Sequence, residues 1–248
     1  MGRTHYFKYD TLNRNVTMAW IRKAVQIFPN LASSFVFAPE GANETRIDFA
    51  STCCEYIDPQ RFSSYTAKYL FLKFQYGQNP LYFTEYLSEI RQLLEFSPSV
   101  QREGAYILDA LKIGREKMMC VHNRRTDFVP LRIATKLNDT VEATIRIAQE
   151  TGASQFMFFG DDQKFMGRLA EAVAETGIYR REAMYISQFT DALDLYVSSQ
   201  VCHSFFITAA TSTFGWWLAF FARDQSNVYY VLDSRMHEQK LPKTELFL

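Results

Sequence analysis

Residues 117–129 read KMMCVHNRRTDFV, an apolar run that ends in a cluster of charged and polar side chains. The segment from Lys117 to Val121 predicts a buried strand. Two adjacent arginines, Arg124 and Arg125, follow its carboxyl end. A guanidinium stays charged at physiological pH, and its planar fork of donors matches phosphate oxygens. The stretch therefore predicts a strand that delivers an anion site, with a diphosphate as the natural candidate. The alternative is a solvated loop whose arginines pair with Asp127.

Segments typical of strands alternate with segments typical of helices along the chain, which predicts an α/β fold built on parallel sheets. The predicted strands are 4–9, 34–38, 117–121, 155–159, 183–186, 205–208 and 228–232. The predicted helices are 16–28, 81–94, 100–112, 140–149, 164–175, 192–199 and 214–223. A Ser-Pro-Ser sequence at 97–99 interrupts two helices, so we expect a boundary near residue 100, with domains at 1–100 and 101–248.

Composition limits the classes of partner. Of the 248 residues, 48% are apolar, enough for a sizeable core. Lys plus Arg equals Asp plus Glu at 27 each, so the formal net charge is zero. The chain as a whole therefore does not attract nucleic acid or an acidic membrane electrostatically. Anion binding must therefore come from a local cluster.

Two further segments end in polar side chains. FMFFGDD at 156–162 is an aromatic strand followed by Gly160 and two carboxylates, and 194–222 contains a helix, a short strand, a Thr/Ser turn and an aromatic helix. Ligands of doubly wound sheets bind outside the carboxyl ends of the strands. Since all three motifs fall at such ends, we expect them to form one site.

Together the three segments resemble the alpha-1,2-fucosyltransferase family, glycosyltransferase family eleven, over nearly the whole chain. The matches to its HxRRxD, FSDD-like and Cys…STFxWW patterns are His122, Arg124, Arg125, Asp127, Phe159, Gly160, Asp161, Asp162, Cys202, Ser212, Thr213, Phe214, Trp216 and Trp217. The resemblance implies a GT-B-like fold of two Rossmann-type lobes, with the acceptor-side lobe first and the GDP-sugar lobe second. It also implies inverting transfer of fucose from GDP-L-fucose to the 2-hydroxyl of a galactose-containing glycan, without a metal ion.

The resemblance also implies roles for individual residues. Arg124 binds the leaving diphosphate, supported by Arg125, and donors aimed at developing charge lower the barrier. Asp127 is the nearest candidate for a catalytic carboxylate. His122 and Asp127 orient the loop or reach the nucleotide, or form a structural hydrogen-bonded pair; these alternatives stay open.

A carboxylate can accept two hydrogen bonds from guanine, a role expected of Asp162 first and Asp161 second. The alternative is N-capping of the helix that follows. Ser212 and Thr213 precede a helix whose amides can hold phosphate. Trp216 and Trp217 are expected in the core.

The four cysteines do not form a metal signature: Cys53 and Cys54 are adjacent, and Cys120 and Cys202 are interpreted as small core residues. A lumenal disulfide is an open alternative. Sequons at Asn15, Asn43 and Asn138 suit the Golgi location typical of the family.

The uncharged stretch 205–222 is expected to be a strand, turn and helix, not a membrane span. The sequence begins in what looks like the family's second strand, without a signal anchor or glycine-rich G-x-G-N loop. We therefore expect an incomplete first lobe, and attachment to a membrane only through a further N-terminal anchor. An inactive or truncated relative that keeps nucleotide or partner binding is the second hypothesis. An ordinary dinucleotide binder is disfavoured by the absence of G-x-G-x-x-G.

Overall fold

A computed structural model describes residues 6–9, 14–36, 39, 41–49, 56–73, 79–112, 117–209 and 211–231. The chain separates between Ser97 and Pro98 into two compact units, hereafter unit 1 and unit 2. Pro98 is the first residue of a helix, where its missing N–H costs no intrahelical bond.

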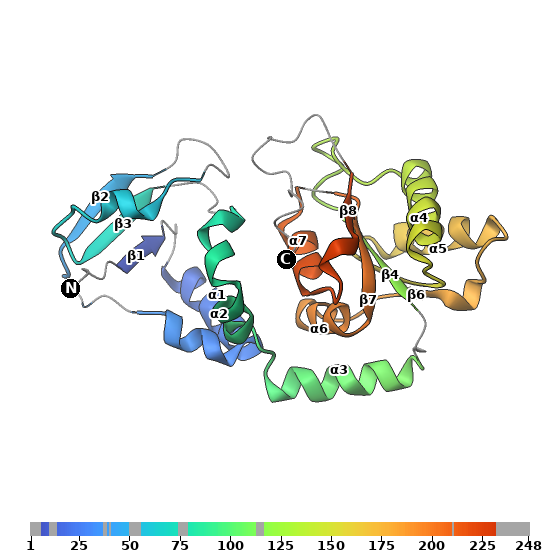
Figure 1. Cartoon of the computed structure of the whole chain (residues 1–248), viewed down its shortest axis with the longest axis horizontal. Helices are drawn as coiled ribbons and strands as arrows, with labels where there is room; N and C mark the ends of the chain where they lie inside the picture. Colours follow the sequence, from blue (N-terminus) through green and yellow to red (C-terminus); the bar gives the residue numbers. More distant parts are fainter. Residues whose placement is uncertain are drawn as a thin grey trace. The chain divides into compact units, whose positions relative to one another are not determined.

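Unit 1 contains a three-stranded parallel sheet with the order β1-β3-β2. Its helices and strands are β1 (Tyr6–Tyr9), α1 (Arg14–Ile27), β2 (Glu44–Asp48), β3 (Tyr69–Lys73) and α2 (Leu87–Leu93) (Figure 1). Five of its buried side chains form a small apolar cluster: Ile47, Phe49, Phe62, Leu70 and Leu72.

Several predictions for unit 1 are wrong. The strand expected at 34–38 begins on the last residue of a 3₁₀ helix, Pro29–Ser34, and then has no strand structure at Phe35 and Val36; residues 37 and 38 lie outside the described residues. Strands β2 and β3 were not predicted: β2 (ETRID) shows no clear apolar alternation, whereas β3 (YLFLK) is an apolar run that was overlooked. The helix expected at 81–94 begins as two 3₁₀ turns and becomes α-helical only from Leu87.

Unit 2 contains a five-stranded parallel sheet with the order β6-β5-β4-β7-β8. Its elements are α3 (Pro98–Ala110), β4 (Met118–Asn123), α4 (Leu137–Thr151), β5 (Gln155–Gly160), α5 (Gln163–Glu175), β6 (Met184–Ile186), α6 (Asp191–Val201), β7 (Cys202–Ile207), α7 (Thr213–Phe221) and β8 (Val228–Tyr230). The predicted α/β fold class, with two units built on parallel sheets, is confirmed.

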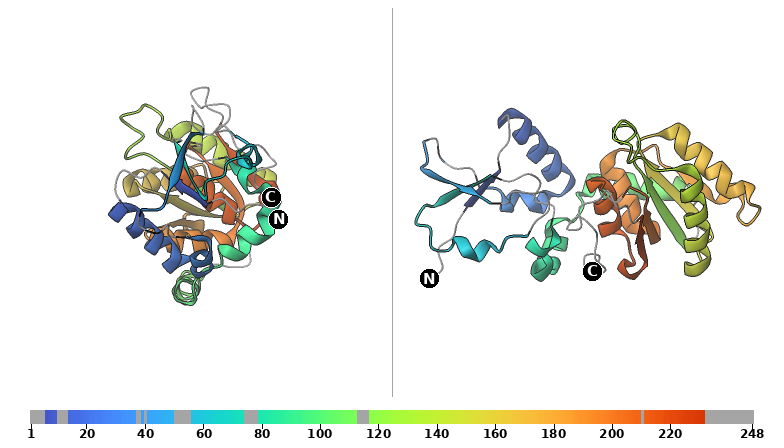
Figure 2. Two further views of the ribbon diagram at one scale, coloured as in Figure 1. Left: turned by 90° about the vertical axis from the view of Figure 1, so that its left-hand side faces the viewer. Right: turned by 90° about the horizontal axis from the view of Figure 1, so that it is seen from above.

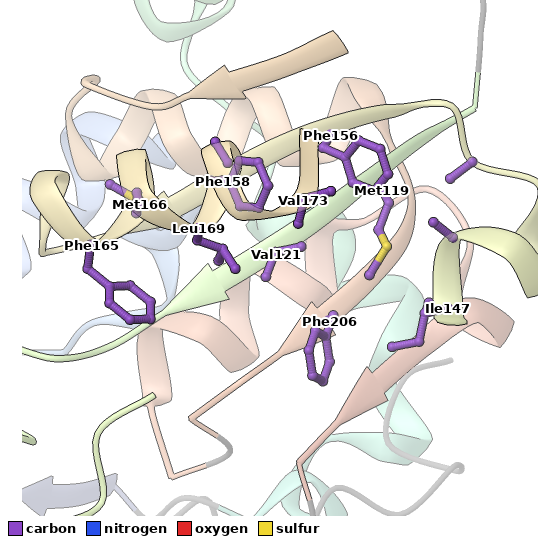
Figure 3. Packing of buried hydrophobic residues seen from close by; sticks show 13 residues of the cluster. Met119, Val121, Ile147, Phe156, Phe158, Phe165, Met166, Leu169, Val173 and Phe206 are labelled. Atoms are coloured by element: carbon purple, nitrogen blue, oxygen red, sulfur yellow. The ribbon is translucent and has the colours of Figure 1, made fainter. Parts of the chain in front are cut away.

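Helices cover both faces of the unit 2 sheet. Figure 2 shows α4 and α5 on one side of the strands and α6 and α7 on the other. On the α4/α5 side, Phe156 and Phe158 of β5 pack with Phe165 and Leu169 of α5, as Figure 3 shows. All six residues of β4 are buried, as expected for the central strand of a parallel sheet.

Cys120 of β4 and Cys202 of β7 form a disulfide on neighbouring strands. Both side chains are fully buried, so they are core residues as predicted and are also covalently linked. Cys53 and Cys54 lie outside the described residues. The stretch 205–222 is divided between β7 and α7, as predicted. Within the described ranges, every helix is too short or too polar to cross a bilayer.

Candidate functional site

The three motifs converge at one edge of the unit 2 sheet. In the parallel register, Asn123 at the end of β4 lies opposite Gly160 of β5, and His122 lies opposite Ile207 of β7. The segments that follow these strands therefore leave the sheet side by side. Gly160 is required at its position, because an added Cβ would lie 2.5 Å from the Asn123 carbonyl oxygen. Residues 124–135, which follow β4, are called the arginine loop below.

Asp161 holds the start of the arginine loop. Its Oδ1 accepts a hydrogen bond of 2.8 Å from the Arg125 amide, and its Oδ2 accepts one of 3.0 Å from the Thr126 amide and another from the Thr126 hydroxyl. Burial alone raises the pKa of Asp161, but these bonds and the Arg124 charge outweigh it and lower the pKa below its usual value. The carboxylate stays ionised, with both oxygens engaged by the loop.

Arg124 and Asp127 form a bidentate ion pair inside the loop. The Arg124 Nε and Nη2 atoms donate to the two Asp127 oxygens at 2.7 and 2.9 Å, and Nε also lies 3.4 Å from Asp161 Oδ2. The Arg124 side chain is one-third exposed, at 32%. Its hydrogen bond to Asp127 is the main cause of the lowered pKa of that carboxyl. The structure thus favours Asp127 as the group that orients Arg124, because a lowered pKa makes a weak general base.

Arg125 points toward the next strand. Its Nε donates to Asp162 Oδ2 at 3.2 Å, and its Nη1 donates to the Thr135 carbonyl oxygen. Its guanidinium also lies over the Phe165 ring, 4.2 Å from the centroid, within the range of a cation–π contact. Arg125 is therefore held on three sides.

Asp162 caps α5. Its Oδ1 accepts a hydrogen bond of 2.9 Å from the Phe165 amide, and its other oxygen pairs with Arg125. Asp162 is thus the N-cap of α5, the role that the sequence analysis gave as the alternative to guanine binding. Each Asp162 oxygen already accepts one hydrogen bond in the structure, and guanine recognition by Asp162 stays a prediction.

His122 and Ser212 lie beside the start of α7. Ser212 caps this helix through a 3.3 Å bond from the Gly215 amide to its hydroxyl. A Cβ at Gly215 would lie 2.4 Å from His122 Nδ1, so only glycine lets α7 pack on the ring. Burial lowers the pKa of His122 to about 4. Its Nδ1 has no hydrogen-bond partner among the described residues. Thr213 is exposed at the first helical position.

The site also contains residues that sequence reasoning missed. Asp194 of α6 is buried, and its carboxylate accepts a hydrogen bond from the Ser187 hydroxyl. Burial raises the pKa of Asp194 to about 7, against the effect of that bond, and the neighbouring Asp191 raises it further. The Asp191 charge also raises the pKa of Arg124. The sequence signal that could have indicated Asp194 is the pair of carboxylates, Asp191 and Asp194, in the first turn of the otherwise largely apolar helix α6.

No family model matches the chain. A galactoside 2-alpha-L-fucosyltransferase of Caenorhabditis elegans is 32% identical over 239 residues, which are 93% of this chain and 64% of the relative. The chain is a relative of the alpha-1,2-fucosyltransferases. Another C. elegans protein of the same name is 28% identical over 255 residues, 91% of this chain and 61% of that protein. The resemblance seen in the three motifs is confirmed. The chain spans about three-fifths of the length of these curated relatives.

Solved structures give a weaker likeness. The crystal structure of POFUT1 in complex with GDP matches with a TM-score of 0.49 and 12% identity, covering 70% of this chain and 59% of that chain. POFUT1 in complex with GDP-fucose matches with a TM-score of 0.48, over 66% of this chain. No role of an individual residue follows from matches at this level.

The alpha-1,2-fucosyltransferase motifs thus coincide with the carboxyl ends of β4, β5 and β7. The described residues contain no group of three or more His, Cys, Asp or Glu side chains that could hold a metal ion. Arg124 and Arg125 lie at this edge, and both are already oriented by carboxylates.

Proposed function

We propose that this chain binds GDP-L-fucose at the carboxyl edge of the unit 2 sheet and transfers fucose to the 2-hydroxyl of a galactose-containing glycan. The observation that carries the proposal is the pair Arg124 and Arg125, held at the end of β4 in a relative of galactoside 2-alpha-L-fucosyltransferases. The C. elegans relatives supply the substrate class, and the site supplies oriented donors for a diphosphate.

In the proposed reaction, the acceptor oxygen forms a bond to the anomeric carbon while the bond from that carbon to the diphosphate oxygen breaks. Attack on the opposite face inverts the configuration. The acceptor hydroxyl loses its proton, and the electron pair of the broken bond stays on the leaving GDP. Negative charge therefore grows on the diphosphate, where preorganised donors stabilise the transition state most.

The two arginines have different tasks in this proposal. Arg124 uses two of its nitrogens on Asp127, which leaves the Nη1 donors outside that pair and available to phosphate oxygens. Arg125 is tied to Asp162, Thr135 and the Phe165 ring, so it supports the loop and adds positive charge at short range. Ser212 and Thr213 at the start of α7 are proposed as further phosphate contacts.

Carboxylates at this edge orient the two arginines. Asp127, Asp161 and Asp162 each pair with or lie near one of the two arginines. Such a mixed cluster orients the guanidinium groups before the ligand arrives, which reduces the ordering cost of binding. We infer that the arginines act without a metal ion.

We place the reaction in the lumen of the secretory pathway, in the Golgi. The buried Cys120–Cys202 disulfide is typical of oxidising compartments. The sequon residues Asn43 and Asn138 are both exposed, as oligosaccharide attachment requires.

The test is binding of GDP to the chain by titration calorimetry, with Arg124→Ala and Arg124→Lys as variants. We expect Arg124→Ala to weaken GDP binding by roughly 1.5–3 kcal/mol, the scale of hydrogen bonds to charged groups. Arg124→Lys should also weaken it, because a point charge cannot replace a fork of donors. Arg132→Ala, which removes an arginine of the same loop outside the proposed contacts, is the matched control and should keep the wild-type affinity.

A transfer assay separates the enzyme from a binding protein. The chain is incubated with GDP-fucose and a galactose-terminated acceptor, with and without a chelator. Chelator-resistant transfer that Arg124→Ala abolishes supports the enzyme. GDP binding without transfer, also after a family-type opening segment is joined to the N-terminus, would favour a binding role. Equal GDP affinity of Arg124→Ala and the wild type would contradict the donor site.

A further inference from the structure

Two buried threonines connect the arginine loop to the sheet. Thr135 ends the loop and Thr208 follows β7; their exposed fractions are 3% and 7%. Their hydroxyl oxygens lie 2.6 Å apart, across 73 residues of sequence. Buried hydroxyls are nearly always hydrogen bonded, and this contact joins the end of the arginine loop to the segment that follows β7.

The direction of each bond follows from the number of protons. The Thr208 hydroxyl donates to the His122 carbonyl oxygen at 2.8 Å. A hydroxyl has one hydrogen, so Thr208 Oγ1 must accept from the Thr135 hydroxyl in their mutual contact. Thr135 Oγ1 is then left as an acceptor for the Arg124 amide, at 3.4 Å. The four groups form one directed chain, from the Arg124 amide through both hydroxyls to the His122 carbonyl.

This chain of bonds surrounds the start of the arginine loop. Besides its side-chain bonds, Thr135 donates its amide to the Arg124 carbonyl oxygen at 3.4 Å. Its own carbonyl accepts from Arg125 Nη1. Thr135 thus contacts the backbone of one arginine and the side chain of the other, while Thr208 ties Thr135 to β4.

We propose that Thr135 and Thr208 are positioning residues for the transfer reaction: their hydroxyl pair fixes the Arg124 backbone and therefore the direction from which its guanidinium meets the diphosphate. This inference rests on the proposed donor site. Neither threonine touches the donor; both act through Arg124. Hydrogen bonds to phosphate depend on donor direction, so a small rotation of the Arg124 backbone weakens the contact without removing the charge.

The first measurement needs no ligand. Hydrogen exchange of the Arg124 amide, followed by NMR, reports whether the Thr135 hydroxyl protects it. We expect Thr135→Val to speed this exchange at least tenfold and Thr135→Ser to leave it within threefold of wild type, because serine keeps the hydroxyl. Equal exchange in wild type and Thr135→Val would overturn the proposal.

The second measurement is GDP affinity by calorimetry. We expect Thr135→Val to weaken GDP binding at least fivefold and Thr208→Val to weaken it less, with Thr135→Ser near wild type. Thr140→Val is the matched control: Thr140 is also buried, but its hydroxyl donates to the carbonyl of Lys136, the N-cap of α4, outside the arginine loop. It should lower stability and leave GDP affinity unchanged. An equal loss of affinity in Thr140→Val would overturn the positioning role.

An Arg124→Ala background separates positioning from general destabilisation. If Thr135 acts through Arg124, adding Thr135→Val to Arg124→Ala changes GDP affinity less than twofold. A full additional fivefold loss would overturn the proposal. Should Thr135→Val fail to fold, Thr208→Val carries the same test, since it removes the acceptor of the Thr135 hydroxyl without touching Arg124. A wild-type chain that binds no GDP would refute the donor site and, with it, the role of Thr135 and Thr208 in positioning Arg124 for GDP. Hydrogen exchange of the Arg124 amide would still show whether the two threonines order the arginine loop.

Discussion

The carboxylate of Asp161 accepts a 2.8 Å hydrogen bond from the backbone amide of Arg125, so the end of β5 holds the loop that leaves β4. The same carboxylate also binds the amide and hydroxyl of Thr126. One carboxylate therefore satisfies three donors of the arginine loop. The geometry favours Asp161 as the organiser of this loop over its predicted part in reading the base.

Asp161→Asn should disturb the loop and the donor site together. The amide nitrogen of asparagine must face one set of donors, which leaves an amide of Arg125 or Thr126 unpaired. We expect the variant to lose about 1–3 kcal/mol of unfolding free energy, measured by urea denaturation, and to bind GDP more weakly. Asp139→Asn, at an exposed carboxylate of α4, is the control. Unchanged GDP affinity in Asp161→Asn would contradict this interpretation.

Asp162→Asn tests base selectivity with the helix cap retained. Asparagine is as good an N-cap as aspartate, so the bond to the Phe165 amide survives and only the charge toward Arg125 and the ligand is lost. If Asp162 reads guanine, the ratio of GDP to ADP affinity should fall while the melting temperature changes little. A preserved ratio would show that Asp162 serves only α5 and Arg125.

Asp194 and His122 predict a specific dependence of stability on pH. The folded pKa of Asp194, about 7, exceeds its unfolded value of 3.8, so its contribution is full below pH 3.8 and is lost as pH rises toward 7. The folded pKa of His122, about 4, is below its unfolded value of 6.5, so stability is lost as pH falls from 6.5 to 4. Between about pH 4 and 6.5 the two slopes are opposite, each up to about 1.4 kcal/mol per pH unit, and they offset each other.

Asp194→Asn should therefore expose the His122 slope. We expect the unfolding free energy of this variant, measured in urea from pH 4.5 to 6.5, to rise with pH more steeply than that of the wild type. Asp191→Asn, at an exposed carboxylate of the same helical turn, should change the slope much less. Parallel curves for Asp194→Asn and the wild type would show that the Asp194 carboxyl titrates near its ordinary value.

The disulfide gives a prediction for stability. Cys120 and Cys202 are 82 residues apart in sequence, so the bond closes a long loop in the unfolded chain. We expect the double variant Cys120→Ala/Cys202→Ala to lose about 2–4 kcal/mol of unfolding free energy. Because both sulfurs are fully buried, dithiothreitol should leave the native protein oxidised and reduce it only in denaturant. Labelling of Cys120 or Cys202 in the untreated native protein, found by peptide mass mapping, would contradict the bond.

The sequence by itself determined the α/β class, the five strands and five helices of unit 2, and the motif positions at strand ends. Local patterns suffice there, because burial of a parallel strand leaves an apolar run and the polar residues after it mark the loop. In unit 1, β2 was missed because ETRID has no apolar run or alternation. Strand β3, YLFLK, carries the apolar run of a buried parallel strand and was overlooked.

Only the tertiary structure decided which side chains bond to one another and which are buried. The Thr135–Thr208 contact, the Cys120–Cys202 bond and the burial of Asp194 join segments that are distant in sequence or depend on packing around the side chain. The same holds for Asp162, whose two oxygens are engaged by α5 and by Arg125. A residue type and its neighbours in sequence indicate what a side chain can bind; the sheet register, by placing strand ends side by side, determines what it does bind.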